Sequence, residues 1–343
     1  MKHAAGVMSD AGSREVRLKM QNQAIGGPLV TIGLAVFEEE RYLRLTLESL
    51  LAQDYGNFRL IICDNASTDG TEDICREFED RDPRIQYFRS ASNVGAIANF
   101  NRTFELASGK YFMWAGAHDL WEPTFISTAV ATLEASPEVV LVYPRVMRIN
   151  GEGERSGLMH DLDMRGLSPL NRYLKIISEL ESCNMFHGLM RAEVLGQTHL
   201  LKDCWASDII LLAELALKGE FELLSEVLFY RREFRPEEHD LERWKIRALK
   251  TIEGEQPSNR REMSLAELFR EMRNEELRLI FRSNLSPRQK LSAMVGTIKA
   301  ARARFGVRLP GDAALRVLAA MRSPRNFVRR VRARFHRSQT RSV

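Results

Sequence analysis

Three aspartates, Asp64, Asp119 and Asp208, are the side chains in this sequence whose type and position best fit chemistry. Asp64 ends an apolar segment, where a carboxylate can accept hydrogen bonds from the N–H of a nucleotide base or from a ribose hydroxyl. Asp119 follows another apolar segment, and one or two carboxylates together with phosphate oxygens form the ligand set that Mg²⁺ prefers. Asp208 opens a helical segment and could act as the general base for a hydroxyl group. Each aspartate also has a structural interpretation, because Asp64 can stabilise a turn and the other two can cap helices.

Two motifs that contain glycine are further candidates. Asn93-Val94-Gly95 precedes a helical segment. Gly95 permits close approach of the backbone, and a helix N-terminus favours phosphate, although an ordinary N-cap is the alternative interpretation. His187-Gly188 is a polar pair inside an apolar stretch. A lone histidine is more often structural, but the adjacent glycine would fit close approach of a ligand.

Alternating strand and helix patterns in the first half are expected to position these residues. The expected strands are Leu29–Val36, Phe58–Cys63, Ile85–Phe88 and Tyr111–Trp114, and the expected helices are Glu38–Gln53, Thr71–Phe78 and Ala96–Ala107, the last closed by Gly109 as a C-cap. This alternation predicts a parallel sheet with helices on both faces, and such sheets bind ligands beyond the carboxyl ends of their strands. The residues that lie just past expected strand ends are Phe37, Glu38, Asp64, Asn65, Asn93 and Asp119.

The second half is less regular. We expect helices at Pro123–Ala135, Leu170–Leu180 and Ser207–Leu217, and strands at Val139–Tyr143, Met185–Met190 and near Glu226–Tyr230. Asn150–Gly157 has the composition of a turn, and His160–Ser168 that of a mobile loop. Beyond Arg235 the sequence is charged and helical.

The composition indicates a soluble globular protein, with 44% hydrophobic and 28% charged residues. The four cysteines are scattered without metal-binding spacing, which is typical of reduced thiols in the cytosol. We find no apolar run of the roughly 18–20 residues that a membrane span needs. Met1–Gly27 lacks the apolar core of a signal peptide and is expected to be a flexible lead-in. We therefore expect a cytoplasmic protein.

The charge is distributed unevenly. Ser286–Val343 contains 15 lysines and arginines and one acidic residue, whereas Met1–Leu285 contains 35 basic and 45 acidic residues. Leu291–Arg308 and Ala313–Arg337 mix apolar residues with many arginines, as basic amphipathic segments at anionic lipid surfaces do. A solvated tail or a nucleic-acid contact is the alternative. We favour the inner face of a membrane and expect no nucleic-acid partner.

Taken in order, these segments resemble family 2 glycosyltransferases with the GT-A fold over about Pro28 to Arg232. The segments that carry the resemblance are Thr31–Leu43 (TIGLAVFEEERYL), which is similar to the opening strand and its acidic turn; Leu47–Tyr55 (LESLLAQDY), similar to the SLLxQxY helix; Leu60–Thr71 (LIICDNASTDGT), similar to the VDNxSxDGT signature; Asn93-Val94-Gly95, similar to the NxG element; Gly109–Asp119 (GKYFMWAGAHD), similar to the run into the metal-binding carboxylates; and Ser207-Asp208 through Tyr230-Arg231-Arg232, similar to the base-bearing helix and the closing LFYRR strand.

The resemblance implies an α/β GT-A fold, with a mostly parallel sheet flanked by helices. Residues 28–120 would form a nucleotide-sugar donor half, residues 121–235 an acceptor half, and residues 236–343 a helical, basic C-terminal extension. The implied site residues are Asp64, Phe37, Glu39, Asn93, Gly95 and His118 for the nucleotide and donor, Asp119 for Mg²⁺ or Mn²⁺, His187 and Gly188 for the acceptor region, and Asp208 as the catalytic base. The sequence departs from the family at Ala117-His118-Asp119, where an Asp-x-Asp or Asp-Asp set is usual, so that only one carboxylate is present.

The implied function is inverting transfer of a sugar from a nucleotide-sugar donor to a hydroxyl of a surface polysaccharide or glycolipid acceptor, which could be lipid-linked. The reduced metal motif leaves an alternative, a catalytically impaired nucleotide-sugar-binding or scaffold protein on the same fold. A dinucleotide-dependent oxidoreductase shares the strand–helix alternation, but no GxGxxG follows the first strand.

Overall fold

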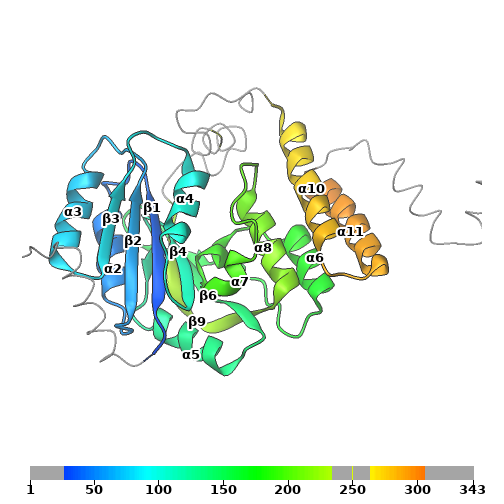
Figure 1. Ribbon diagram of the computed structural model, residues 1–343, viewed down its shortest axis with the longest axis horizontal. Helices are drawn as coiled ribbons and strands as arrows, with labels where there is room; N and C mark the ends of the chain where they lie inside the picture. The colour runs from blue at the N-terminus through cyan, green and yellow to red at the C-terminus, as the bar shows by residue number, and fades with distance from the viewer. Residues whose placement is uncertain (1–26, 234–248, 250–262, 306–343) are drawn as a thin grey trace, which may run out of the picture.

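The structure is a computed structural model that describes residues 27–233, Leu249 and residues 263–305 (Figure 1). Its centre is a nine-stranded mixed sheet in the order β3-β2-β1-β4-β8-β6-β9-β5, with β7 paired to β6. The strands are β1 Val30–Val36, β2 Phe58–Asp64, β3 Ile85–Arg89, β4 Tyr111–Ala115, β5 Leu120–Trp121, β6 Val139–Ile149, β7 Arg155–Leu158, β8 Leu189–Arg191 and β9 Glu220–Arg232. The helices are α2 Leu43–Leu51, α3 Thr71–Arg81, α4 Ala96–Glu105, α5 Phe125–Ala135, α6 Pro169–Glu179, the 3₁₀ helix η1 Asn184–His187, α7 Ala192–Gly196, α8 Ser207–Lys218, α10 Leu265–Arg282 and α11 Pro287–Phe305.

The first four strands are parallel, as predicted, and their carboxyl ends meet at one edge. β1 pairs in parallel with β2 on one side and with β4 on the other, and β2 pairs in parallel with β3. The apolar, β-branched sequence of β1 suits a strand that is buried on both faces. β8, β5 and β7 join the sheet antiparallel, which the strand–helix alternation of the first half does not predict.

Helices cover both faces of the sheet, and each face has its own core. In β4, Tyr111 and Met113 face a core that includes α2, α3 and α5, whereas Phe112 and Trp114 face a core that includes α6 and α8. Strand periodicity explains this division, because successive side chains point to opposite faces. The α/β architecture flanked by helices is therefore confirmed.

The C-terminal helices α10 and α11 pack beside α6 and α8 (Figure 1). Ser264 and Glu267 form a capping box that begins α10. In α11, Ala293 and Thr297 are fully buried, and the Thr297 hydroxyl lies 2.8 Å from the Tyr173 hydroxyl of α6. Part of the segment predicted to bind a membrane, Leu291–Arg308, thus has its apolar side covered by protein. The other predicted membrane segment, Ala313–Arg337, lies outside the described residues, as do the lead-in over residues 1–26 and much of the extension from residue 236.

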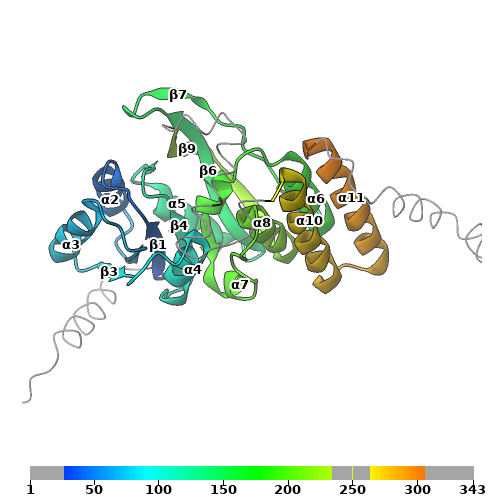
Figure 2. The same cartoon turned by 90° about the horizontal axis from the view of Figure 1, so that it is seen from above.

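Several predicted element boundaries are wrong. α2 begins at Leu43 rather than Glu38, because the preceding residues form a loop that bonds to the loop after β2. α4 ends at Glu105 with Leu106 as its C-cap, so Gly109 lies in the turn before β4 instead of capping the helix. β6 and β9 are much longer than predicted because they pair with each other along most of their lengths. Part of the predicted turn 150–157 belongs to β7, which forms with β6 a hairpin that projects from the molecule in Figure 2.

One further prediction in the second half is wrong. The predicted strand Met185–Met190 is divided into η1 and the short β8, with Gly188 between them. The segment His160–Ser168 is a loop, as predicted, in which Leu162 and Met164 are buried in the core and the Tyr143 hydroxyl donates to the Leu162 carbonyl. Across the described ranges, no helix combines the length and the apolar character needed to cross a bilayer.

Candidate active site

The loops that follow β1 and β2 are bonded to each other at the carboxyl edge of the sheet. The Glu38 carboxylate accepts hydrogen bonds from the Thr68 N–H at 2.8 Å and the Thr68 hydroxyl at 2.9 Å. The Glu40 carboxylate accepts one from the Gly70 N–H at 2.8 Å. Glu38 has a φ of 54°, a strained conformation for a residue with a side chain, which these bonds help to maintain. Phe37 stays 40% exposed at this edge.

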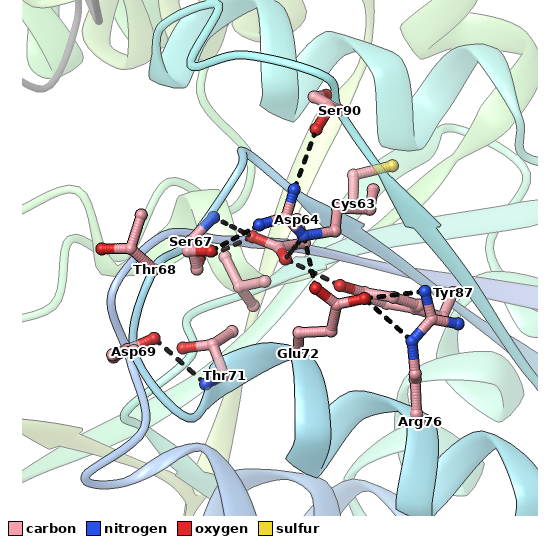
Figure 3. A network of polar contacts seen from close by, with 12 residues as sticks. Cys63, Asp64, Ser67, Thr68, Asp69, Thr71, Glu72, Arg76, Tyr87 and Ser90 are labelled. Atoms are coloured by element: carbon pink, nitrogen blue, oxygen red, sulfur yellow. Dashed lines mark hydrogen bonds and ion pairs between the residues drawn. The ribbon is translucent and has the colours of Figure 1, made fainter.

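Asp64 is the fully buried centre of a polar network at the end of β2 (Figure 3). One carboxylate oxygen accepts from the Ser67 N–H at 2.9 Å and the Ser67 hydroxyl at 2.6 Å. The other accepts from the Tyr87 hydroxyl at 2.7 Å and lies 3.5 Å from Arg89 Nε. Burial, followed by the hydrogen bond to Asp64, raises the pKa of Tyr87, so that this phenol remains a donor. The turn-forming role of Asp64 is thus realised, and a contact with a nucleotide base stays a prediction.

Asn93 and Gly95 lie where the sequence predicts, between β3 and α4 at the same edge. The Asn93 side-chain oxygen accepts from Asn65 Nδ2 at 2.7 Å and from the Gly95 N–H at 2.9 Å. The Asn65 side-chain oxygen accepts in turn from the Val94 N–H at 2.9 Å. Gly95 has a φ of 86° and is the N-cap of α4, and no side chain of the described residues caps the helix there. The first N–H groups of α4 therefore face the edge where a phosphate would be stabilised.

Asp119 is held by the last residue of β9, which is distant in sequence. One Asp119 carboxylate oxygen accepts from the Arg232 N–H at 2.8 Å, and Asp119 is only 3% exposed. The Arg232 side chain donates to the His118 carbonyl at 2.9 Å, and its guanidinium lies 4.5 Å from the centre of the Tyr42 ring. Gly116 is needed here, because a Cβ at that position would lie 2.4 Å from the second Asp119 oxygen.

His187, which is predicted for the acceptor region, lies beside residues that are predicted for the donor and the metal ion. Its Nδ1 lies 3.0 Å from the Trp114 carbonyl, and its ring packs between Phe186 and Phe229. Burial lowers the pKa of His187, while the nearby Asp119 carboxylate raises it. Across this cluster, His118 Nδ1 lies 3.3 Å from a Glu39 carboxylate oxygen. The structure therefore brings Glu39, His118, Asp119 and His187 together.

Asp208 and Gly188 are the remaining site residues that the sequence predicts in the second half. Asp208 is half-buried in the first turn of α8, and its carboxylate accepts from the Ile209 N–H at 2.9 Å. Among the described residues, no hydrogen bond joins Asp208 to the Asp119 cluster. Gly188 makes its close approach to protein rather than to an open site, because a Cβ there would lie 2.5 Å from the Val142 carbonyl oxygen.

Arg231 is a candidate that the predicted site did not include. Its guanidinium donates to the Ser182 hydroxyl and, at 3.0 Å, to the Asn184 side-chain oxygen, both in the segment that leads into and forms η1. It is close enough to His187 to lower the pKa of that residue. Within residues 27–233, 249 and 263–305, no carboxylate forms an ion pair with Arg231. The two arginines of the LFYRR segment could have indicated this candidate in the sequence. The sequence does not reveal, however, that Arg231 and Arg232 contact different neighbours.

The predicted metal site has limited support in this geometry. In the described parts of the chain, no group of three histidine, cysteine or acidic residues is arranged to hold a metal ion. Because the Arg232 N–H binds one Asp119 oxygen, the chain offers the second oxygen as the principal ligand atom. The remaining ligands of a divalent cation would have to come from a bound diphosphate and water.

A cavity of about 310 Å³ lies away from this cluster. It is lined by Phe104, Glu105, Ala107, Ser108, Gly109, Tyr111, Ala192 and Leu200. Several of these residues belong to the turn that enters β4, and none is a predicted site residue, so the cavity lies at the opposite edge of the parallel strands. It does not represent the predicted donor site.

The parallel strands with polar loops at their carboxyl edge form an α/β domain, and domains of this kind bind ligands at that edge. Residues 31–193 match the family described as Glycosyl transferase family 2, so this region of the chain is similar to family 2 glycosyltransferases. The fold also resembles that of Staphylococcus aureus TarS residues 1–349, solved in complex with UDP, with a TM-score of 0.59 and 16% identity over 82% of this chain and 73% of that one. This likeness supports the GT-A fold.

Curated relatives match a shorter stretch. The putative glycosyltransferase EpsE of Bacillus subtilis is 35% identical over 109 residues, which are 32% of this chain and 39% of that protein. The Escherichia coli UDP-Glc:alpha-D-GlcNAc-diphosphoundecaprenol beta-1,3-glucosyltransferase WfaP is 34% identical over 106 residues, or 31% of this chain and 41% of that protein. The chain thus spans about two fifths of the length of these two relatives.

Proposed function

We propose that this protein transfers a sugar from a nucleoside-diphosphate sugar to a hydroxyl group of an acceptor, with inversion at the anomeric carbon. The observation that carries the proposal is the convergence of Glu39, His118, Asp119 and His187 at the carboxyl edge of the parallel strands in a family 2 domain. Ligands of such sheets bind at this edge.

The nucleotide would bind along the loops after β1, β2 and β3. Phe37, which is exposed, would contact the base or ribose, and Glu39 and His118 would line the same pocket. Asn93 and Gly95 would place the N-terminus of α4 toward the phosphates. Asp64 would reach the base only by exchanging one of its present partners, so we assign it the role of fixing these loops as well as the predicted base contact.

Asp208 is the proposed general base. Its carboxylate would take the proton of the acceptor hydroxyl while that oxygen bonds to the anomeric carbon. The bond from this carbon to the diphosphate oxygen breaks in the same step, and the nucleoside diphosphate leaves with the electron pair. A single displacement of this kind inverts the anomeric configuration.

The leaving diphosphate requires positive charge. When bound through the free oxygen of Asp119, Mg²⁺ or Mn²⁺ would offset that charge. Arg231 is the chain's own cation at this position, and we propose that it contacts the donor phosphates. Its neutral partners Ser182 and Asn184 orient the guanidinium without cancelling its charge.

The acceptor is proposed to be a glycan or a lipid-linked sugar presented at the cytoplasmic face of a membrane. The name of the similar protein WfaP describes a lipid-linked acceptor, and the basic composition of residues 306–343 suits an anionic surface. We further propose residues 28–235 as the catalytic domain and residues 236–343 as a basic extension.

The test is a panel of UDP-, dTDP- and GDP-sugars assayed for binding and turnover with and without Mn²⁺. Wild type is expected to bind and turn over one donor class, and Asp208→Asn to keep donor affinity while losing about 100-fold or more in kcat. Absence of binding to every donor would overturn the proposal. Binding without turnover in the wild type would instead favour the impaired or scaffold protein, which the single carboxylate of the Ala117-His118-Asp119 motif supports.

A further inference from the structure

The turn that leads into Asp208 is strained. Leu200 and Ala206 have φ values of 53° and 54°, although neither is glycine. Positive φ is unfavourable for residues with a Cβ and persists only where neighbouring contacts enforce it. The contacts around residues 200–206 therefore determine how the chain enters α8.

One set of contacts comes from the catalytic domain. The Asn101 side chain of α4 accepts from the Leu201 N–H at 3.1 Å and donates to the Leu201 carbonyl at 2.8 Å. The Ser207 hydroxyl accepts from the Lys202 N–H at 2.6 Å. The first half of the turn is thus fixed to the helix whose N-terminus lies at the proposed donor edge.

The second set comes from α10, which lies outside the segment matched to the family. Lys202 Nζ lies 2.6 Å from Glu275 Oε2, and the two side chains are only 22% and 13% exposed. Trp205 packs edge-on against Phe269, with ring centroids 6.4 Å apart. Both rings belong to a small core that α10 shares with α8 and the turn.

A further link joins the other end of α10 to α8. His199 Nδ1 lies 3.0 Å from a Glu214 carboxylate oxygen, and Arg282 Nη1 lies 2.7 Å from His199 Nε2. Glu214 is on α8 and Arg282 is the last residue of α10. α10 is therefore connected at two points, to the strained turn itself through Lys202 and Trp205 and to α8 through His199.

We infer that α10 positions the catalytic carboxylate, with Glu275 and Phe269 as the positioning residues. The carboxylate of Asp208 is bonded within the described residues only to the N–H of Ile209, so its direction follows from the start of α8. That start is set by the turn which α10 holds through Lys202 and Trp205. The inference rests on the proposed role of Asp208 and extends the active unit beyond the α/β domain.

The experiment uses the full chain with Glu275→Gln, and Arg278→Gln as the matched control. Arg278 contacts the same Glu275 carboxylate but is 63% exposed, so its loss leaves the Lys202 contact in place. Glu275→Gln is expected to lower kcat about 10- to 100-fold through misplacement of Asp208, with donor Kd unchanged. The control should retain wild-type kcat. The charge exchange Lys202→Glu with Glu275→Lys should restore part of the lost rate.

A separate measurement follows hydrogen exchange of the amides of residues 200–209. Glu275→Gln is expected to speed their exchange, whereas Arg278→Gln is not. Unchanged kcat in Glu275→Gln, or a donor Kd that weakens as much as kcat falls, would overturn the inference. If the wild-type protein transfers no sugar, the proposed function fails. The hydrogen-exchange measurement then still tests whether α10 positions the turn. Unchanged amide exchange rates in Glu275→Gln would show that it does not.

Discussion

At the scale of single residues, Asp64 shows that a residue which the sequence predicts for a binding site can have a structural role. Its fully buried carboxylate accepts three hydrogen bonds, and two of them come from its own turn. The sequence pattern predicts an important aspartate at this strand end. It does not distinguish a residue that contacts ligand from one that shapes the loops around it, because both roles need a carboxylate at the same place.

We expect Asp64→Asn to lower the free energy of unfolding by about 1–3 kcal/mol, because the amide presents a donor where Ser67 and Tyr87 also donate. Urea denaturation followed by circular dichroism measures this change. Tyr87→Phe removes only one of the bonds and should cost about 1 kcal/mol. Wild-type stability in Asp64→Asn, combined with lost nucleotide binding, would show that the residue serves the ligand alone.

Arg231 is expected to contribute affinity for phosphate groups in the absence of a metal ion. Arg231→Gln should weaken binding of UDP or GDP about tenfold in EDTA, since a charge-assisted hydrogen bond contributes about 1.5–3 kcal/mol. Arg231→Lys should retain part of the affinity. Isothermal titration calorimetry measures these constants, and Arg165→Gln, at an exposed ion pair with Asp163, is the control. Equal affinities in all variants would contradict the proposed contact of Arg231 with the donor phosphates.

At the scale of elements, the first half could be predicted because its strands and helices are encoded locally. β1 and β2 are short, mostly apolar runs, and α2 and α3 bury residues with helical spacing. The second half could not, because η1, β7 and the long pairing of β6 with β9 depend on distant partners. The apolar sequence around His187 has no period that separates a 3₁₀ turn from a strand.

Gly188, between η1 and β8, allows a direct test of how far the second half depends on contacts between residues distant in sequence. Gly188→Ala should destabilise the protein by about 1–3 kcal/mol, because the added Cβ would lie 2.5 Å from the Val142 carbonyl oxygen. Gly196→Ala is the control, since its Cβ would meet Phe104 only at an ordinary 3.8 Å. Thermal unfolding of the two variants provides the comparison. Equal melting temperatures would mean that the backbone at Gly188 is less constrained than the structure indicates.

At the scale of the whole molecule, the charge distribution of the sequence changes from acidic to basic near Leu285. The hydrophobic core of the structure nevertheless includes residues beyond that point. Ala293 and Thr297 of α11 are buried, and Thr297 contacts Tyr173 of α6. Charge composition cannot locate this boundary, because a basic helix can bury a narrow stripe of small residues and expose its arginines.

Two shortened chains separate folding from surface binding. A chain ending at Leu285 should melt at a lower temperature, because it exposes the α6 surface that α11 covers. A chain ending at Phe305 should keep the wild-type melting temperature but lose cosedimentation with phosphatidylglycerol vesicles, since residues 306–343 carry ten arginines and one aspartate. Phosphatidylcholine vesicles are the control. Equal partitioning of the full and the 305-residue chains would exclude the tail as a membrane contact.

The bond between Asp119 and the Arg232 N–H joins residues 113 positions apart in the chain. Ribosomal synthesis completes the predicted donor motifs before β9, so a nascent chain would carry these motifs with Asp119 still unanchored. Asp119 can therefore be anchored only after β9 is present to supply the Arg232 N–H. A fragment limited to the region matched by the family would contain the recognisable sequence without the oriented carboxylate.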